Sequence, residues 1–408
     1  MPPAALNAVK SRLKTTQAYQ WLLRRRGAKE DEAYSDLCRR STEALDQSSN
    51  WEEISRRLLS AGWSGPKTRR TRASEVRVFV VDLPAIGGPW FEEELAREFR
   101  TTVFSISRHM RGYLEGRRNL VDYSCGVFPE DYNKAFPGVS DPAWKLAFQR
   151  DLLASYTRAR QEGSFDLCLV YGTNAYLDRE TLQSLRADGT PVALMCLDDK
   201  HAHDSIKPLL GSYDIHLTNS LECIPWYLAK KQASYWYPQG IDTSYFAPKT
   251  RSRDIQVSFV GIRYGARLDF IDQLRREGVE VECFGPGWPN GVVDDQRDIY
   301  ARSWVNLGVG YTGFSYRSTC VKGRDFEIPA TANLYLTTYN FELADLFSIG
   351  SEILCYHDPM DCASQVRRLL ADPERIEAIG RAGRERCVRD HTWTARMNGL
   401  LKFMGILG

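Results

Sequence analysis

The sequence predicts an α/β protein made of two doubly wound parallel-sheet domains, preceded by a helical extension. Three observations carry this prediction. First, short apolar runs alternate with helix-like stretches after residue 75. Second, this alternation pauses at the polar stretch 247–254 and then restarts. Third, the first 74 residues show no such alternation. Strands that alternate with helices are typical of βαβ units in a parallel sheet. With 408 residues, the chain is long enough for two such domains.

Residues 1–74 are expected to form the helical extension. Apolar residues over 6–22 follow a loose helical spacing, and Trp51–Leu59 has the pattern of an amphipathic helix. The first 75 residues hold 15 Lys and Arg against 9 Asp and Glu. We favour a solvated helix end for the basic run Arg24–Arg26 over contact with an anionic membrane surface or polymer. The polar, basic stretch 63–74 is expected to be a linker.

The first domain is expected over 75–248. Its predicted strands are the apolar runs 76–83, 101–107, 165–172, 191–198, 214–220 and 233–240. Helix-like stretches such as Phe91–Phe99 and Pro142–Gln161 separate several of them. This order predicts a Rossmann-like arrangement, in which one sheet carries helices on both faces.

The second domain is expected over 249–385, and a C-terminal helix over 386–408, for which a return to the first domain stays open. Its predicted strands are 255–261, 279–285, 304–310, 333–338 and 351–356. Asp358-Pro359 and Asp372-Pro373 predict two helix starts, since each places a capping carboxylate before a proline suited to the first turn. Two such domains in series form a cleft between their carboxyl-end loops, where ligands bind in open α/β sheets.

Composition excludes several classes of protein. The net charge of +2 indicates no general attraction to nucleic acid. No apolar run approaches the ~20 residues of a membrane span, and we expect no secretory signal. The ten cysteines form no CxxC pair, so neither a zinc site nor a disulfide framework is expected. These features favour a cytoplasmic protein, with a peripheral membrane contact or oligomerisation through residues 1–74 left open.

The second half also resembles a known family. The run "KGRDFEIPATANLYLTTYNFELADLFSIGSEILCYHDP" (322–359), followed by "ADPERIEAIGRAGRERCVRDHTWTAR" (371–396), is similar to the donor-binding domain of GT-B-fold glycosyltransferases. Within them it resembles the CgeB-like (spore-maturation type) family, with a donor domain like that of the glycosyl transferases group 1. "YPQGIDTSYFAP" (237–248) looks like the passage into that domain, and "VSFVGIRYGARLDFIDQL" (257–274) like its first strand, loop and helix. The resemblance is strong over 235–396 and weaker over 75–234.

The resemblance implies an enzyme that moves a sugar from a nucleotide-diphosphate donor to an acceptor hydroxyl on a glycan, glycolipid, protein or small molecule. It implies a hexosyltransferase-like, metal-independent and retaining reaction, in which the nucleotide-sugar is a substrate and no cofactor is needed. Two alternatives stay open: a catalytically silent carbohydrate-binding or surface-assembly protein on the same fold, and a GT-B-fold nucleotide-sugar epimerase.

A donor diphosphate gains negative charge as the sugar departs, and cations in a dry cleft stabilise that charge. Lys322 and Arg324 are the main candidates, with Arg263 and Arg267 on the loop after the first strand of the donor domain. The alternative for the two loop arginines is pairing with Asp269 or Asp272 on the following helix.

The resemblance places Glu327 at the ribose diol, because one carboxylate accepts from two hydroxyls. The alternative is a surface pair with a neighbouring arginine. Related retaining enzymes often have a second glutamate eight positions earlier, where this chain has Thr319. Gly285 in "FGPGW" is expected either to make a turn or to let the backbone approach the base.

The first domain offers two further candidates. Gly87 and Gly88 follow its first strand, and their amides are candidates for a phosphate or acceptor. "CLDDKHAHD" (196–204) is predicted to bring acidic and imidazole groups to the cleft edge. Asp199 and His201 are the candidate catalytic groups there, for acid/base work on the acceptor hydroxyl. A metal site and a helix cap are the alternatives in this run.

We expect no metal at the donor site, because cations rather than a carboxylate pair follow the donor-domain strands. The adjacent Asp294 and Asp295 are expected to be solvated, whereas Asp198 and Asp199 belong to the other domain.

Overall fold

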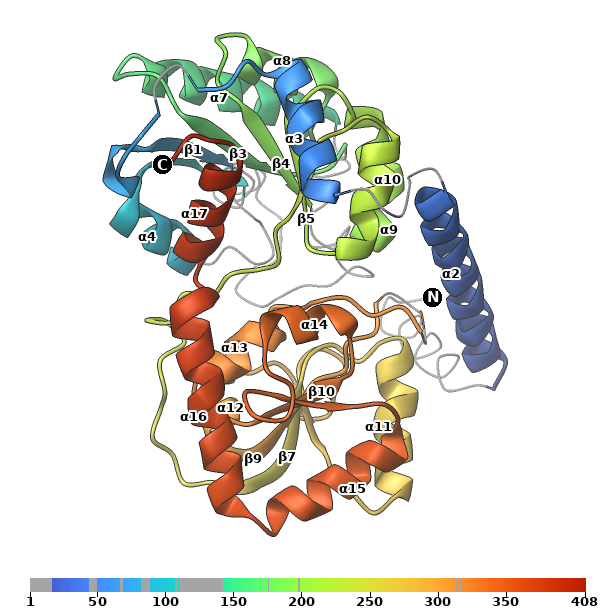
Figure 1. The fold of residues 1–408 in the computed structure, drawn as a ribbon. Helices are drawn as coiled ribbons and strands as arrows, with labels where there is room; N and C mark the ends of the chain where they lie inside the picture. The colour runs from blue at the N-terminus through green and yellow to red at the C-terminus, as the bar shows by residue number, and fades with distance from the viewer. Residues whose placement is uncertain are drawn as a thin grey trace.

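The computed structural model describes residues 17–43, 50–66, 69–81, 89–106, 109, 142–174, 176–196, 199–312, 315 and 317–408. These residues form two parallel-sheet α/β domains, one above the other in Figure 1, which confirms the predicted fold class. The expected helical spacing over 6–16, together with Gly87, Gly88 and Asp198, lies outside the described residues.

The first sheet has six parallel strands in the order β2-β1-β3-β4-β5-β6. The strands are β1 (Arg77–Val81), β2 (Arg100–Phe104), β3 (Leu167–Tyr171), β4 (Val192–Cys196), β5 (Ile215–Thr218) and β6 (Ser234–Trp236). Five of them lie within runs that the sequence predicted to be strands, and β2 begins one residue before its predicted run 101–107.

Both faces of this sheet are buried. Val78 and Val80 of β1 pack in one hydrophobic cluster, while Phe79 and Val81 pack in another, as the two-residue period of a strand requires. The covering helices are α4 (Pro89–Glu98), α7 (Pro142–Arg160), α8 (Arg179–Arg186), α9 (Asp199–Ile206) and α10 (Ile224–Ala229).

The second sheet has five parallel strands in the order β11-β10-β9-β7-β8. They are β7 (Ile255–Val260), β8 (Glu282–Phe284), β9 (Ser303–Leu307), β10 (Tyr335–Thr338) and β11 (Leu354–Tyr356). Its helices are α11 (Ala266–Arg276), α12 (Gln296–Arg302), α13 (Arg324–Ala330), α14 (Phe341–Leu346), α15 (Pro359–Leu370) and α16 (Pro373–Asp390).

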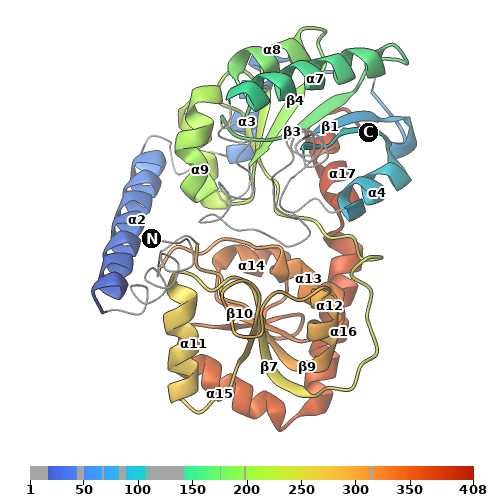
Figure 2. The same ribbon diagram turned by 180° about the vertical axis from the view of Figure 1, so that it is seen from behind.

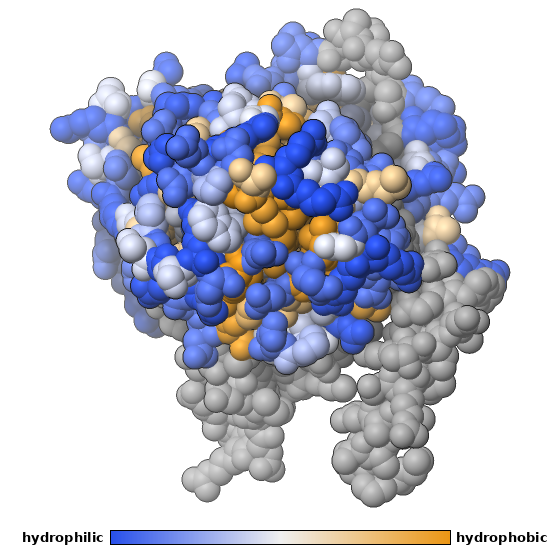
Figure 3. Space-filling view, turned by 90° about the horizontal axis from the view of Figure 1, so that it is seen from below, coloured by the Kyte–Doolittle hydropathy of each residue, from blue (hydrophilic) through white to orange (hydrophobic). Residues whose placement is uncertain are grey.

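The two predicted Asp-Pro helix starts are confirmed. The Asp358 carboxylate accepts from the amide of Asp361 at 2.8 Å and caps α15, and the Asp372 carboxylate accepts from the amide of Arg375 at 3.1 Å and caps α16. Seen from below, the outer end of this domain is mostly hydrophilic around a narrow hydrophobic band (Figure 3).

Among the described residues, the chain passes between the two sheets twice, and the two crossovers lie side by side. The amide of Ile241 in the first crossover donates to the carbonyl of His391 in the second at 2.9 Å. A Cβ on Gly240 would stand 2.7 Å from the Cα of Trp393, so only glycine allows this approach. After the second crossover, α17 (Trp393–Phe403) packs on the first sheet through residues such as Met397.

The N-terminal helices differ in how they attach. Helix α3 (Trp51–Gly62) packs into the first domain: Leu59 is buried in the core, and the Ser55 hydroxyl donates to the carbonyl of Ser234 at 2.6 Å. This part of the expected extension is therefore integrated into the domain. Helix α2 (Gln17–Glu43) instead lies at the side of both domains (Figures 1 and 2).

Candidate active site

The carboxyl ends of the two sheets face each other, and the loops that follow the strands meet there. Asn219 and Ser220 follow β5, whereas Val321 lies in the loop after β9 and Glu342 in the first turn of α14, which follows β10. The Asn219 amide donates to the Val321 carbonyl at 3.3 Å, and the Ser220 hydroxyl donates to the Glu342 carboxylate at 3.1 Å. Such an edge is where ligands bind in open α/β sheets.

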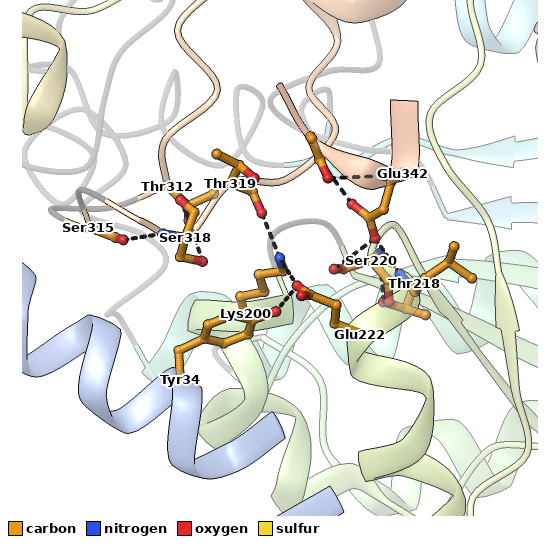
Figure 4. A network of polar contacts seen from close by, with 12 residues as sticks. Tyr34, Lys200, Thr218, Ser220, Glu222, Thr312, Ser315, Ser318, Thr319 and Glu342 are labelled. Carbon is orange, nitrogen blue, oxygen red and sulfur yellow. Dashed lines mark hydrogen bonds and ion pairs between the residues drawn. The ribbon is translucent and has the colours of Figure 1, made fainter. Parts of the chain in front are cut away.

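Glu342 is the centre of one of these interdomain links (Figure 4). Its side chain is fully buried, and it also accepts from the backbone amide of Leu221. Within its own domain it accepts from the Asn340 side chain at 3.2 Å. Burial raises the pKa of this carboxyl, and the positive charge of Lys200 opposes that rise.

Lys200 makes a second interdomain link. Its ammonium donates to the carbonyl of Thr319 at 2.6 Å, pairs with the Glu222 carboxylate and lies over the ring of Tyr34 at 4.7 Å. Tyr34 of α2 donates to the same carboxylate, and Asp31 of α2 accepts from Ser315 of the second domain. Figure 4 shows Lys200 and Tyr34 converging on Glu222. Helix α2 thus touches both domains beside the Lys200 link.

Glu327 lies on α13 at the carboxyl edge of the second sheet. Its Oε2 accepts from the Gln296 side chain at 3.1 Å and from the Tyr300 hydroxyl at 3.2 Å. Its Oε1 would stand 2.9 Å from a Cβ built on Gly323, so this oxygen lies over the turn that begins α13. Burial raises the pKa of the carboxyl, against the opposing charge of Arg324. The carboxylate is therefore oriented through one oxygen by two side chains of α12.

Arg324 is fixed against the end of β7. Its Nη1 donates to the Val260 carbonyl at 2.6 Å, and its guanidinium lies over the ring of Phe259 at 5.3 Å. A Cβ on Gly261 would stand 2.3 Å from Nη1, so glycine is needed for the guanidinium to fit. Its buried Nε has no hydrogen-bond partner among the described residues.

Lys322 is presented by a turn that the buried Asp325 holds. The Lys322 amide donates to Asp325 at 2.6 Å, and the Tyr335 hydroxyl donates to the other oxygen of this carboxylate at 2.6 Å. Burial raises the pKa of Asp325. The turn thus keeps Lys322, Arg324 and Glu327 within one short segment at the sheet edge.

Arg263 and Arg267 both belong to the region after β7, but they differ in environment. The Arg263 guanidinium lies over the ring of Trp288 at 5.6 Å. Arg267 is buried, donates to the Ile262 carbonyl at 3.3 Å and stacks over Tyr264 at 4.6 Å. These contacts indicate that Arg267 stabilises the loop to which it belongs.

Gly285 has a structural reason for being glycine. Its φ is +117°, and an added Cβ would stand 2.5 Å from the carbonyl oxygen of Gly261. The loops after β7 and β8 therefore pack backbone to backbone. This packing favours the turn, which is one of the two roles that the sequence predicted for Gly285.

In the first domain, Asp199 is only 1% exposed. Its Oδ2 is 3.2 Å from Nε2 of the fully buried His216, whose Nδ1 is 3.0 Å from the Tyr213 hydroxyl. His216 also stacks on Tyr227 with ring centroids 3.8 Å apart. Oδ2 of Asp199 is thus directed at a core imidazole, whereas its Oδ1 is buried without a hydrogen-bond partner among the described residues. The expected contact with an acceptor hydroxyl stays a prediction. The side chain of His201 lies outside what the structure describes.

Asp295 is not the solvated group that the sequence predicted. It caps α12 and pairs with Arg297 at 2.7 Å and with Lys249 at 2.6 Å. The hydrogen bond from Arg297, and then that from Lys249, lowers the pKa of its carboxyl. Over the described parts of the chain, no group of three or more His, Cys, Asp or Glu is arranged to hold a metal ion. None of the described helices is long and apolar enough to cross a membrane.

Sequence reasoning placed the runs 196–204 and 237–248 near the interdomain region, but it assigned no role there to Lys200, Gln239 or Glu342. Lys200 stands inside the charged run 196–204, and Gln239 inside the conspicuous run 237–248. Nothing local distinguishes them from their neighbours, because their partners lie far away in the sequence.

Comparisons with known proteins agree with this architecture. Residues 267–402 match a family model described as glycosyl transferase-like. No curated protein matches the chain in sequence. Several solved structures share its fold at low identity, and three of them follow.

Sucrose-phosphate synthase from Thermosynechococcus elongatus has 11% identity, a TM-score of 0.52, and coverage of 80% of this chain and 98% of its own. Alr3699/HepE from Anabaena, solved with UDP and glucose, is 10% identical with a TM-score of 0.51. The match covers 80% of this chain and 98% of the Anabaena chain. A glycosyltransferase from Rickettsia africae has 9% identity, a TM-score of 0.52, and coverage of 81% and 97%. The chain therefore has a GT-B-like fold, in which residues 267–402 match the glycosyl transferase-like family.

Proposed function

We propose that this chain is a glycosyltransferase that moves a sugar from a nucleotide-diphosphate donor to an acceptor hydroxyl. One observation carries the proposal: the segment with Lys322, Arg324 and Glu327 lies within the family match and at the edge that faces the other domain. The UDP and glucose bound by the Anabaena neighbour support a nucleotide-sugar donor.

Each group of this segment has a chemical role in the proposed reaction. Lys322 and Arg324, with Arg263, supply positive charge to the diphosphate as the glycosidic bond breaks. Arg324 suits this role because its guanidinium is already held by Val260, so little side-chain entropy is lost when a phosphate arrives. Closure of the two domains excludes water that would otherwise hydrolyse the donor.

Glu327 is proposed to accept from the ribose diol. Gln296 and Tyr300 hold its Oε2, so the carboxylate has one fixed orientation, with Oε1 over Gly323. Arg267 and Gly285 are proposed to support the loops of the donor site. The CgeB-like relationship, retention of configuration and metal independence remain part of the proposal.

Nucleotide binding by Glu327 variants tests the assignment. Removing the acceptor leaves buried hydroxyls unsatisfied, at about 1–3 kcal/mol, so Glu327→Ala is expected to weaken nucleotide binding by about tenfold or more. Isothermal titration with UDP, GDP, TDP and CMP measures this, after a thermal-shift screen of the four nucleotides and their sugars. Glu280→Ala, an exposed carboxylate of the same domain, is the matched control.

Unchanged affinity in a folded Glu327→Ala protein would remove Glu327 from the donor site. Product analysis then separates the alternatives. Transfer to an acceptor, or release of free nucleotide, supports a transferase, whereas a donor isomerised without acceptor indicates an epimerase. A protein that binds nucleotide-sugars and turns none of them over is a silent binding protein.

A further inference from the structure

Gln239, in the first crossover, has a buried side-chain oxygen that accepts no hydrogen bond from the described residues. The side chain is 4% exposed, and its Oε1 is buried without a hydrogen-bond partner among the described residues. An amide oxygen left in this state costs about 1–3 kcal/mol. Buried polar atoms are nearly always satisfied, so this oxygen calls for an explanation, and a donor on a bound ligand supplies one.

The orphan oxygen lies at the proposed donor site. A Cβ built on Gly323 would be 2.9 Å from Oε1 of Gln239 and also 2.9 Å from Oε1 of Glu327. The two oxygens therefore converge on one face of Gly323, within about twice that distance of each other. Gln239 comes from the interdomain crossover and Glu327 from α13, so tertiary structure alone brings them together.

The backbone of Gln239 is held in place from the second crossover. Nε of Arg396, a residue of α17, donates to the Gln239 carbonyl at 3.5 Å, and the next residue, Gly240, packs against Trp393. Burial lowers the pKa of Arg396 to about 10, so its guanidinium is charged at neutral pH. The Gln239 side chain thus extends from a rigid support.

The chemistry of the pair selects its ligand. Both converging atoms are acceptors, one on an amide and one on a carboxylate, so they suit a ligand with two hydroxyl donors and disfavour a phosphate. Resting on the proposed function, we propose that Gln239 and Glu327 together bind the vicinal diol of the donor ribose, one hydroxyl each. Gln239 is then a specificity residue for ribonucleotides over deoxynucleotides, and it links an occupied donor site to the interdomain crossover.

The test compares ribose and deoxyribose ligands on the full chain. Isothermal titration measures UDP and GDP with their 2′-deoxy and 3′-deoxy forms against wild type, Gln239→Met and Gln239→Leu. Met keeps the length of the side chain and removes the acceptor, and Leu provides a second variant if one is unstable. Gln273→Met, an exposed glutamine on α11, is the matched control.

We expect wild type to prefer the ribonucleotide over one of its deoxy forms by about fivefold to tenfold, as for one hydrogen bond. In both Gln239 variants, the affinity for the ribonucleotide should fall by the same factor. The affinity for the deoxy form that lacks the hydroxyl bound by Gln239 should change less than twofold. Equal losses for all forms, or no loss, overturn this inference alone, provided that wild type binds nucleotide. A wild-type protein that binds none of them overturns the proposed function as well.

Discussion

Glu94 is expected to make the stability of this protein depend on pH. It lies on α4, is 6% exposed, and its Oε1 accepts from the Thr394 amide at 3.1 Å, at the start of α17. Its Oε2 is buried without a hydrogen-bond partner in the described part of the chain. Burial, and to a lesser extent the charge of Asp242, raises the pKa of this carboxyl from 4.5 to about 7.

The sign follows from proton binding. Between pH 4.5 and about 7 the folded protein keeps the Glu94 proton while the unfolded chain has lost it. The free energy of unfolding therefore falls as pH rises through this window, and the favourable contribution is fully present only below it. A rise of this size corresponds to roughly 3 kcal/mol.

Glu94→Gln removes the titration and keeps an acceptor for the Thr394 amide. From pH 5 to pH 8, the free energy of unfolding of wild type should fall by roughly 3 kcal/mol relative to that of the variant. This corresponds to a relative shift of about 5–10 °C in the Tm of the domain that unfolds with α4. Thermal unfolding at both pH values measures the difference, with Glu93→Gln on the exposed face of the same helix as control. Parallel pH profiles for wild type and Glu94→Gln would refute the reasoning.

Two further predictions concern the extension and the metal. Deleting residues 1–49 removes α2, its contacts to Glu222 and Ser315 and the packing of Leu37. It should leave nucleotide affinity nearly unchanged and lower Tm only slightly, while altering oligomeric state or activity on the acceptor. Deleting residues 1–74 also removes the buried Leu59 and Ser55 and should lower Tm by several degrees; equal Tm values for the two truncations would contradict this. Transfer is predicted to survive excess EDTA and to fall about 100-fold in Lys322→Ala; activity that vanishes with chelator and returns with Mg²⁺ or Mn²⁺ would instead implicate a divalent ion.

Local patterns were enough to predict the elements. The strands of both sheets appear as apolar runs because a strand buried on both faces needs apolar residues throughout, as in Val78–Val81. The caps at Asp358 and Asp372 were readable because a cap depends on residues three positions apart. The segment from Lys322 to Glu327 was identified for the same reason, since its charges lie within six residues.

Tertiary structure alone determined which of these side chains meet. Asp199 appeared to be an open acid, but its carboxylate is directed at His216, 17 residues away, on the neighbouring strand. Glu342 accepts from Ser220 across 122 residues, and the Gln239 side chain lies beside Gly323 of the other domain. The sequence by itself determined the two α/β domains and the position of the charged segment, because backbone periodicity and capping act within a few residues. The orientation of the domains determined the rest of the candidate site, because contacts between distant segments leave no spacing to be read along the chain.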